Sequence, residues 1–289
     1  MYTYIIGLIP VLLFFYSPIV ELFSSPSQSH SPPPRQFNPE LLALEEPSNH
    51  TCPTDTYLVH VFSREPLVLY VENFLSTDER DHLLEISEPL YSPSTITHDG
   101  GGTTHHDRSV RDSDVALVPR TSTVRCIEDR ARALQGWRDE VWIERLRVQR
   151  YGPGGHYAHH FDWNPARSGW GRVSSAMAWV GKSEEGDGEG LVGGGTEFPL
   201  LRAVESGSRW CRFVECAEAK EGDGHTDGDG AGGAVKGVVF KVLPGNAVYW
   251  ENFKADGSRR GFEETWHAGL PVQKGEKVGL NIWSWGRIE

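Results

Sequence analysis

Three residues of this chain have the types and spacing to bind one metal ion. His160 and Asp162 are separated only by Phe161, and His267 follows much later in the chain. In an extended strand, residues i and i+2 point to the same side. His160 and Asp162 can therefore hold one metal while Phe161 packs on the other side. Two histidines and a carboxylate form the set of ligands that suits a non-haem Fe(II) centre with open coordination positions.

A lysine follows the second histidine at a distance that suits an anion-binding role. Lys277 lies ten residues after His267, in a segment that alternates like a strand. One face of that segment carries Lys277, Gly279, Asn281 and Trp283. A lysine on such a face beside a metal site can pair with the distal carboxylate of an acidic co-substrate.

Four ordered sequence blocks carry a family resemblance. They are Arg150 to Asp162 (RYGPGGHYAHHFD), Gly193 to Pro199 (GGGTEFP), Pro244 to Trp250 (PGNAVYW) and Trp266 to Lys277 (WHAGLPVQKGEK). In these blocks and their order, about residues 66–289 resemble the prolyl 4-hydroxylase type of Fe(II)/2-oxoglutarate dioxygenase.

The resemblance implies a reaction, its cofactors and a partner. His160, Asp162 and His267 would bind Fe(II), and Lys277 would pair with the C5 carboxylate of 2-oxoglutarate. O₂ would be consumed, succinate and CO₂ released, and a peptidyl proline hydroxylated at C4. Ascorbate would restore iron that is oxidised in uncoupled cycles. The protein partner would be the peptidyl-proline substrate, and the chain does not indicate whether a partner subunit is needed.

Four further residues match positions that line the site in similar enzymes. Tyr151 and Thr196 match positions that help hold 2-oxoglutarate, and Trp283 is expected to form a wall of the same pocket. Tyr157 matches a position that faces the peptidyl substrate.

Other functions remain open at this level. His156 and His160 could form a zinc pair on a helix, but Gly152, Pro153, Gly154 and Gly155 precede them, and no HExxH motif is present. The same cofactors could act on lysine or on a small molecule. A jelly roll that only binds ligands is a further alternative, which the complete set of candidate ligands and Lys277 oppose.

Composition and periodicity predict an α+β, β-rich fold. Ser76 and Glu79 form a capping box that begins a helix ending near Pro89, and a second helical period runs from Val124 to Leu134. Beyond Trp142 the pattern becomes strand-like, with candidate strands at 144–151, 157–162, 173–180, 238–242, 247–250 and 278–285. Together with the resemblance, this indicates a double-stranded β-helix, or jelly roll, with supporting N-terminal helices.

The N-terminus predicts a membrane anchor. Residues 4–23 are almost wholly apolar, which is close to the length that spans a bilayer. We expect a signal-anchor at 1–23, a Ser/Pro-rich linker at 24–57 and a catalytic domain at 58–289. A cleaved signal peptide is the alternative. Asn49 begins a glycosylation sequon, and the expected location is the endoplasmic reticulum membrane, single-pass, with a luminal catalytic domain.

The net charge, the cysteines and one acidic stretch bear on which ligands the chain binds and which disulfides it forms. A formal net charge of −12 opposes binding to nucleic acid. Four cysteines permit two disulfides, and Cys211 and Cys216 are the expected pair because they are close in sequence. The Gly-rich acidic stretch at 221–230 resembles a calcium loop but lacks its closing glutamate, so we expect an ordinary mobile loop there.

Overall fold

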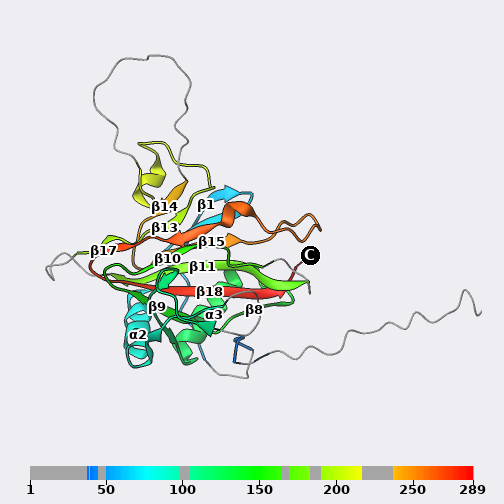
Figure 1. Cartoon of the computed structure of the whole chain (residues 1–289). Coiled ribbons are helices and arrows are strands. Elements are labelled where there is room, and N and C mark those ends of the chain that lie inside the picture. The colour runs from blue at the N-terminus through cyan, green and yellow to red at the C-terminus, as the bar shows by residue number, and fades with distance from the viewer. Residues whose placement is uncertain are drawn as a thin grey trace, which may run out of the picture. The chain divides into compact units, whose positions relative to one another are not determined.

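The computed structural model describes residues 38, 40–44, 50–97, 104–164, 169–182, 190–216 and 237–288 (Figure 1). The chain divides into two compact units, 1–38 and 39–289, and every element below belongs to the second unit. The apolar run at 4–23, the sequon residue Asn49 and the acidic stretch at 221–230 lie outside the described residues.

The larger of two main antiparallel sheets has β18 near its middle. Its strand order is β1-β2-β15-β11-β18-β9-β7-β3, and β8 also pairs with β18. The bounds are β1 Leu58–Arg64, β2 Leu67–Glu72, β3 Ser92–Pro93, β7 Asp114–Leu117, β8 Val141–Ile143, β9 Arg147–Tyr151, β11 Trp170–Lys182, β15 Ala247–Glu251 and β18 Lys277–Arg287. The long pairing of β18 with β11 and β9 fixes which residues of these strands face the same side.

The smaller sheet lies against the inner face of the larger one (Figure 1). Its order is β14-β13-β16-β10-β6, with β6 Arg111–Asp112, β10 His156–His160, β13 Thr196–Phe198, β14 Val238–Phe240 and β16 His267–Gly269. Two short pairs flank the sheets, β4 Ile96–Thr97 with β5 Thr104–His105, and β12 Val192–Gly193 with β17 Val272–Lys274. Tyr70 and Trp179 of the larger sheet pack with Phe198 and Phe240 of the smaller one in one buried cluster. Two antiparallel sheets enclosing such a core form the expected jelly roll.

Two helices cover the outer face of the larger sheet. They are α2 Thr77–Ser87 and α3 Ser122–Leu134, and short 3₁₀ turns lie at η1 Glu88–Leu90, η3 Arg209–Arg212 and η4 Glu263–Thr265. The predicted capping box is confirmed, because Ser76 Oγ accepts from the Glu79 amide and the Glu79 carboxylate accepts from the Ser76 amide. Leu83 of α2 and Ile127 of α3 are fully buried against Val148 and Leu280 of the sheet.

Both disulfides that the four cysteines permit are formed, and one of them is the predicted pair. Cys211 pairs with Cys216 as expected, and Cys52 pairs with Cys126 of α3. The second bridge joins the segment before β1 to the outer face of the larger sheet. Arg130 of α3 supports the same junction, because it forms ion pairs with Asp55 and with Glu79.

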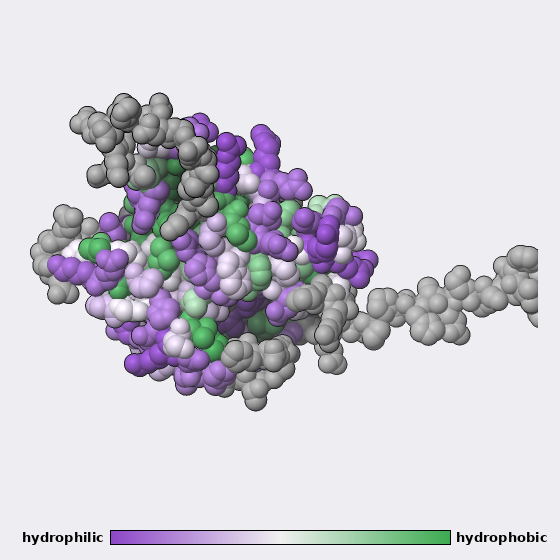
Figure 2. Space-filling view, turned by 45° about the horizontal axis from the view of Figure 1, so that its top comes forward, coloured by the Kyte–Doolittle hydropathy of each residue, from purple (hydrophilic) through white to green (hydrophobic). Residues whose placement is uncertain are grey.

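The surface offers no extended apolar face in the view that is shown. Figure 2 shows apolar residues in small patches among hydrophilic ones. The large apolar side chains that are exposed within the described ranges are Leu58, Val59, Val61, Leu90, Leu117, Trp137, Val192 and Leu200. Single exposed apolar residues are ordinary on a soluble surface.

The predicted membrane anchor requires correction. No helix in the described part of the chain is long and apolar enough to cross a membrane. This finding contradicts the expected single-pass location in the endoplasmic reticulum membrane. The prediction rested on sequence features, chiefly the length and hydropathy of residues 4–23, which are not among the described residues.

Truncating the helix-to-sheet contact should lower stability and leave the pocket intact. Ile127 is fully buried, so Ile127→Ala removes apolar contacts and leaves a cavity. We expect the free energy of unfolding to fall by about 2–5 kcal/mol in urea titrations. Leu117→Ala is the matched control, because Leu117 is exposed and should change stability by less than about 0.5 kcal/mol. Equal stabilities of the two variants would contradict this view of the core.

Candidate active site

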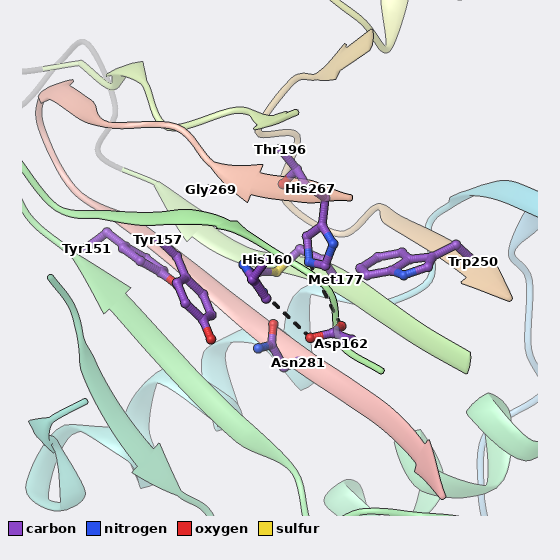
Figure 3. Close-up of a pocket in the computed structure, with 10 residues that line it drawn as sticks. All are labelled: Tyr151, Tyr157, His160, Asp162, Met177, Thr196, Trp250, His267, Gly269 and Asn281. Carbon is purple, nitrogen blue, oxygen red and sulfur yellow. Dashed lines mark ion pairs between the residues drawn. The ribbon is translucent and has the colours of Figure 1, made fainter. Parts of the chain in front are cut away.

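Three side chains from separate parts of the chain meet at one point between the sheets (Figure 3). His160 ends β10 and His267 begins β16, and the two residues are directly opposite in the antiparallel pair. Asp162 lies two residues after β10. Its Oδ1 is 3.6 Å from His160 Nε2, and its Oδ2 is 3.9 Å from His267 Nε2. One potential ligand atom from each residue lies within 4.8 Å of the others, which permits a shared ion.

The position of Asp162 differs in detail from the sequence prediction. The predicted strand at 157–162 ends at His160, so Asp162 occupies a bend and not a strand position. The carboxylate still turns toward the two imidazoles, as Figure 3 shows. The i, i+2 spacing therefore correctly predicted that His160 and Asp162 lie close together, although strand β10 ends before Asp162.

The hydrogen bonds of both histidines leave the same nitrogen available. Nδ1 of His160 lies 2.8 Å from the carbonyl of Ala158, and Nδ1 of His267 lies 2.8 Å from the carbonyl of Thr265. A carbonyl only accepts, so each Nδ1 must carry a proton and donate. The lone pair of a neutral ring is then on Nε2, which points toward Asp162. Such hydrogen bonds to the outer nitrogen orient histidine ligands in metal sites.

Electrostatics favour the protonation states that a metal requires. Burial and the neighbouring His160 lower the pKa of His267 to about 4, against the opposing effect of Asp162. Burial alone would raise the pKa of the Asp162 carboxyl, but His160, His267 and Arg172 together hold it well below its ordinary value. At neutral pH the site therefore presents a neutral imidazole at His267 beside an ionised carboxylate.

A tryptophan fixes the second oxygen of the carboxylate. Trp283 Nε1 donates to Asp162 Oδ2 at 2.9 Å. The guanidinium of Arg172 lies 3.8 Å from the centroid of the Trp283 ring, and that of Arg147 lies 5.6 Å away. Glu144, which is 2% exposed, holds Arg172 through bonds of 2.6 and 3.0 Å and contacts Arg147 at 3.4 Å. Trp283 was expected only as a pocket wall, and its contact with Asp162 had no local sequence signal.

The other predicted residues surround this point. Lys277 is 1% exposed and donates to the carbonyl of Gly194 at 2.6 Å, and its Nζ is 5.1 Å from the centroid of the Tyr151 ring. Burial lowers the pKa of Lys277 to about 8. Thr196 is buried, with no partner for its hydroxyl among the described residues. Tyr157 stacks on His160 with ring centroids 3.7 Å apart.

The metal-site candidates border a partly open pocket, whose lining Figure 3 shows in close-up. It is lined by Tyr151, Tyr157, His160, Asp162, Met177, Thr196, Trp250, His267, Gly269 and Asn281. Met177 and Trp250 were not predicted, because β11 and β15 have no motif that indicates which residues face a ligand. Asn281 could have been found, since it shares a strand face with Lys277 and Trp283.

Neither of the other candidate metal sites competes with this one. His50 lies near the sulfurs of Cys52 and Cys126, but these sulfurs are joined in a disulfide and cannot act as thiolate ligands. His156 and His160 both lie on strand β10 and not on a helix. They therefore do not form the helical i, i+4 pair that a zinc site here would need.

Comparison with known proteins identifies relatives of the chain. Residues 146–285 match the 2OG-Fe(II) oxygenase superfamily. A probable prolyl 4-hydroxylase of Arabidopsis thaliana is 26% identical over 235 residues, which are 78% of this chain and 71% of the relative. The alpha-3 subunit of prolyl 4-hydroxylase from Mus musculus is 26% identical over 80% of this chain and 35% of its own length.

A solved structure covers a similar part of the chain. The viral collagen prolyl hydroxylase of Paramecium Bursaria Chlorella virus-1, in complex with 2-oxoglutarate, aligns with a TM-score of 0.49 and 21% identity. The alignment covers 76% of this chain and 96% of the viral chain.

The hydrogen bond of Trp283 predicts a measurable contribution to metal affinity. Trp283→Phe keeps an aromatic ring under Arg172 but removes the donor to Asp162. Loss of such an outer contact typically weakens metal binding about 10- to 100-fold. Anaerobic calorimetric titration with Fe(II) measures the effect. Trp137→Phe is the control, because an arginine also lies over Trp137, at 4.9 Å, but this ring is exposed. Equal affinities in both variants would remove Trp283 from the support of the site.

Proposed function

We propose that the chain, a 2-oxoglutarate-dependent dioxygenase whose residues 146–285 match the 2OG-Fe(II) oxygenase superfamily, hydroxylates peptidyl proline at C4. The observation that carries this proposal is the convergence of His160, Asp162 and His267 within 4.8 Å beside a buried lysine. The names of the relatives that match most of the chain, which are prolyl 4-hydroxylases, support the substrate class.

The residues at the site fit Fe(II). Two neutral imidazole nitrogens and one ionised carboxylate oxygen are the donors that non-haem iron uses, and three protein ligands leave positions for co-substrate and O₂. We assign His160, Asp162 and His267 to this role. The bound iron supplies oxidative decarboxylation of 2-oxoglutarate to succinate and CO₂ and transfers one oxygen atom of O₂ to the substrate; ascorbate as a reductant is typical of such enzymes.

The residues that would hold the co-substrate lie on the inner face of the larger sheet. Lys277 is the one to pair with the C5 carboxylate of 2-oxoglutarate, since it is a buried cation directly opposite Tyr151 in the β9–β18 pair. Thr196 adds a hydroxyl without a partner among the described residues. Tyr151 and Met177 close the cavity around these groups and exclude water.

The substrate would enter past Tyr157. This ring lines the cavity, stacks on His160 and lies under the guanidinium of Arg111, at 4.6 Å. Burial raises the pKa of the Tyr157 hydroxyl, so the group stays a hydrogen-bond donor at neutral pH. A proline ring packed on an aromatic face beside the metal would present its C4 to the reacting oxygen.

Hydroxylation of a proline peptide tests the proposal directly. The protein, with Fe(II), ascorbate and 2-oxoglutarate, should release one succinate for each oxygen atom gained by a proline-rich peptide, and hydrolysis should yield 4-hydroxyproline. Asp162→Ala should abolish both products because a ligand is lost. His159→Ala is the control, since His159 pairs with Glu197 at 2.8 Å and is not part of the ligand set. Coupled succinate with lysine peptides or a small molecule in place of proline would contradict the substrate assignment.

Co-substrate affinity should depend on pH through Lys277. Its pKa of about 8 means that the ammonium form, which pairs with a carboxylate, is lost in the free protein as pH rises above 8. The Kd for 2-oxoglutarate should therefore rise by up to about tenfold for each pH unit between about pH 8 and pH 10.

Lys277→Arg provides the control for this pH dependence. A guanidinium stays charged throughout the range, so the Kd of the variant should be flat with pH even if it is higher. A flat profile in the wild-type protein would show that Lys277 does not contact the carboxylate.

A further inference from the structure

One buried side chain on β9, the strand that carries Tyr151 to the pocket, has polar atoms without a partner in the described part of the chain. Gln149 of β9 is 0% exposed, and neither its Nε2 nor its Oε1 has a hydrogen-bond partner among the described residues. An unsatisfied carboxamide destabilises a folded protein unless another group completes its bonds. None of the contacts of the fold itself accounts for a glutamine at this position.

Strand register places Gln149 on the face of the sheet that carries the site. Residues alternate along β9, so Gln149 shares a face with Tyr151, which lines the cavity, while Val148 and Arg150 face the helices. The residue directly opposite on β18 is Gly279, which has no side chain to fill the space. Lys277 is the diagonal neighbour on the same strand, within reach of a long side chain.

A second unpartnered donor lies on the other side of the same glycine. Trp179 of β11 is opposite Gly279 in the β11–β18 pair, and its buried Nε1 also has no partner among the described residues. Thr196 and Trp250, which line the cavity, add a hydroxyl and an indole N–H in the same condition. Gln149 and Trp179 thus flank Gly279, two residues from the buried Lys277, whereas Thr196 and Trp250 line the pocket itself. N–H and O–H donors without partners match a ligand whose charged oxygens only accept hydrogen bonds.

We propose that Gln149 is a further co-substrate-binding residue, whose Nε2 donates to the carboxylate of 2-oxoglutarate at the Lys277 end. This inference rests on the proposed placement of the co-substrate along Lys277. The lysine supplies charge, and the amide supplies a directed neutral donor that fixes the rotation of the carboxylate. Gly279 lets the Met177 side chain, which lines the pocket, lie close to β18, since a Cβ at Gly279 would be 2.9 Å from Met177 Sδ.

A co-substrate-binding role of Gln149 and a structural role predict different effects of substitution on the Kd for 2-oxoglutarate and on the Tm. Gln149→Leu removes the polar atoms and nearly keeps the volume of the side chain. The apo protein should then keep or raise its Tm, because an unsatisfied polar group is replaced by an apolar one. The Kd for 2-oxoglutarate should rise about tenfold or more, as expected for a lost hydrogen bond to a charged group. A lower Tm with an unchanged Kd would overturn the proposal.

The binding experiment uses the full chain loaded with Fe(II) under anaerobic conditions. Calorimetric titration with 2-oxoglutarate compares wild type, Gln149→Leu, Gln149→Glu and Gln273→Leu. The glutamate should bind more weakly than the leucine, because it adds a negative charge beside the carboxylate. Gln273 of β17 is exposed, and its variant should bind as wild type does.

Lys277→Ala distinguishes failure of this inference from failure of the site assignment. If Lys277→Ala binds as wild type does, the co-substrate lies elsewhere and the proposed site is wrong. If Lys277→Ala weakens binding while Gln149→Leu and Gln149→Glu do not, the site stands and Gln149 has no part in it. Neither result depends on which substrate is hydroxylated, because binding is measured without turnover.

Discussion

The buried carboxylate of Asp162 is the constraint around which the pocket is built. An anion removed from water must be compensated, and here each oxygen has its own compensation. His160 lies beside Oδ1, and Trp283 donates to Oδ2. The ring of Trp283 in turn lies under the guanidinium of Arg172, which forms an ion pair with the buried Glu144. The Asp162 carboxylate, a proposed metal ligand, is thus connected to a second buried anion through one aromatic ring and one guanidinium.

The same constraint explains the placement of the secondary structure. Glu144 lies between β8 and β9, and Leu42 near the N-terminus pairs with it in an isolated bridge. Arg172 comes from β11 and Trp283 from β18, so the compensation requires the long pairing of these two strands. Residues that never touch a substrate, such as Leu42 and Glu144, therefore contribute to the shape of the ligand set.

That His160, Asp162 and His267 lie together could be predicted because the spacing of these residues and the motifs around them are visible in the sequence. The interval between His160 and Asp162, and that between His267 and Lys277, are visible in the sequence. The Trp283–Asp162 contact joins residues 121 apart and the Arg172–Glu144 contact joins residues 28 apart, and no local pattern encodes the strand register that brings them together. The β-rich fold and the capped helix at Ser76 followed from periodicity. The membrane anchor failed because hydropathy was its chief support.

Strand β18 carries one residue at each end of the pocket. Lys277 begins the strand and Trp283 lies six positions later, both turned inward because their separation is an even number of residues. Insertion of a single residue between them would turn one of the two toward the helices, and no change of rotamer could restore it. Only the insertion or deletion of residues in pairs would keep both side chains on the inner face, and each added pair would move Lys277 and Trp283 about 7 Å further apart along the strand. The number of residues between them therefore fixes the distance between the two ends of the pocket.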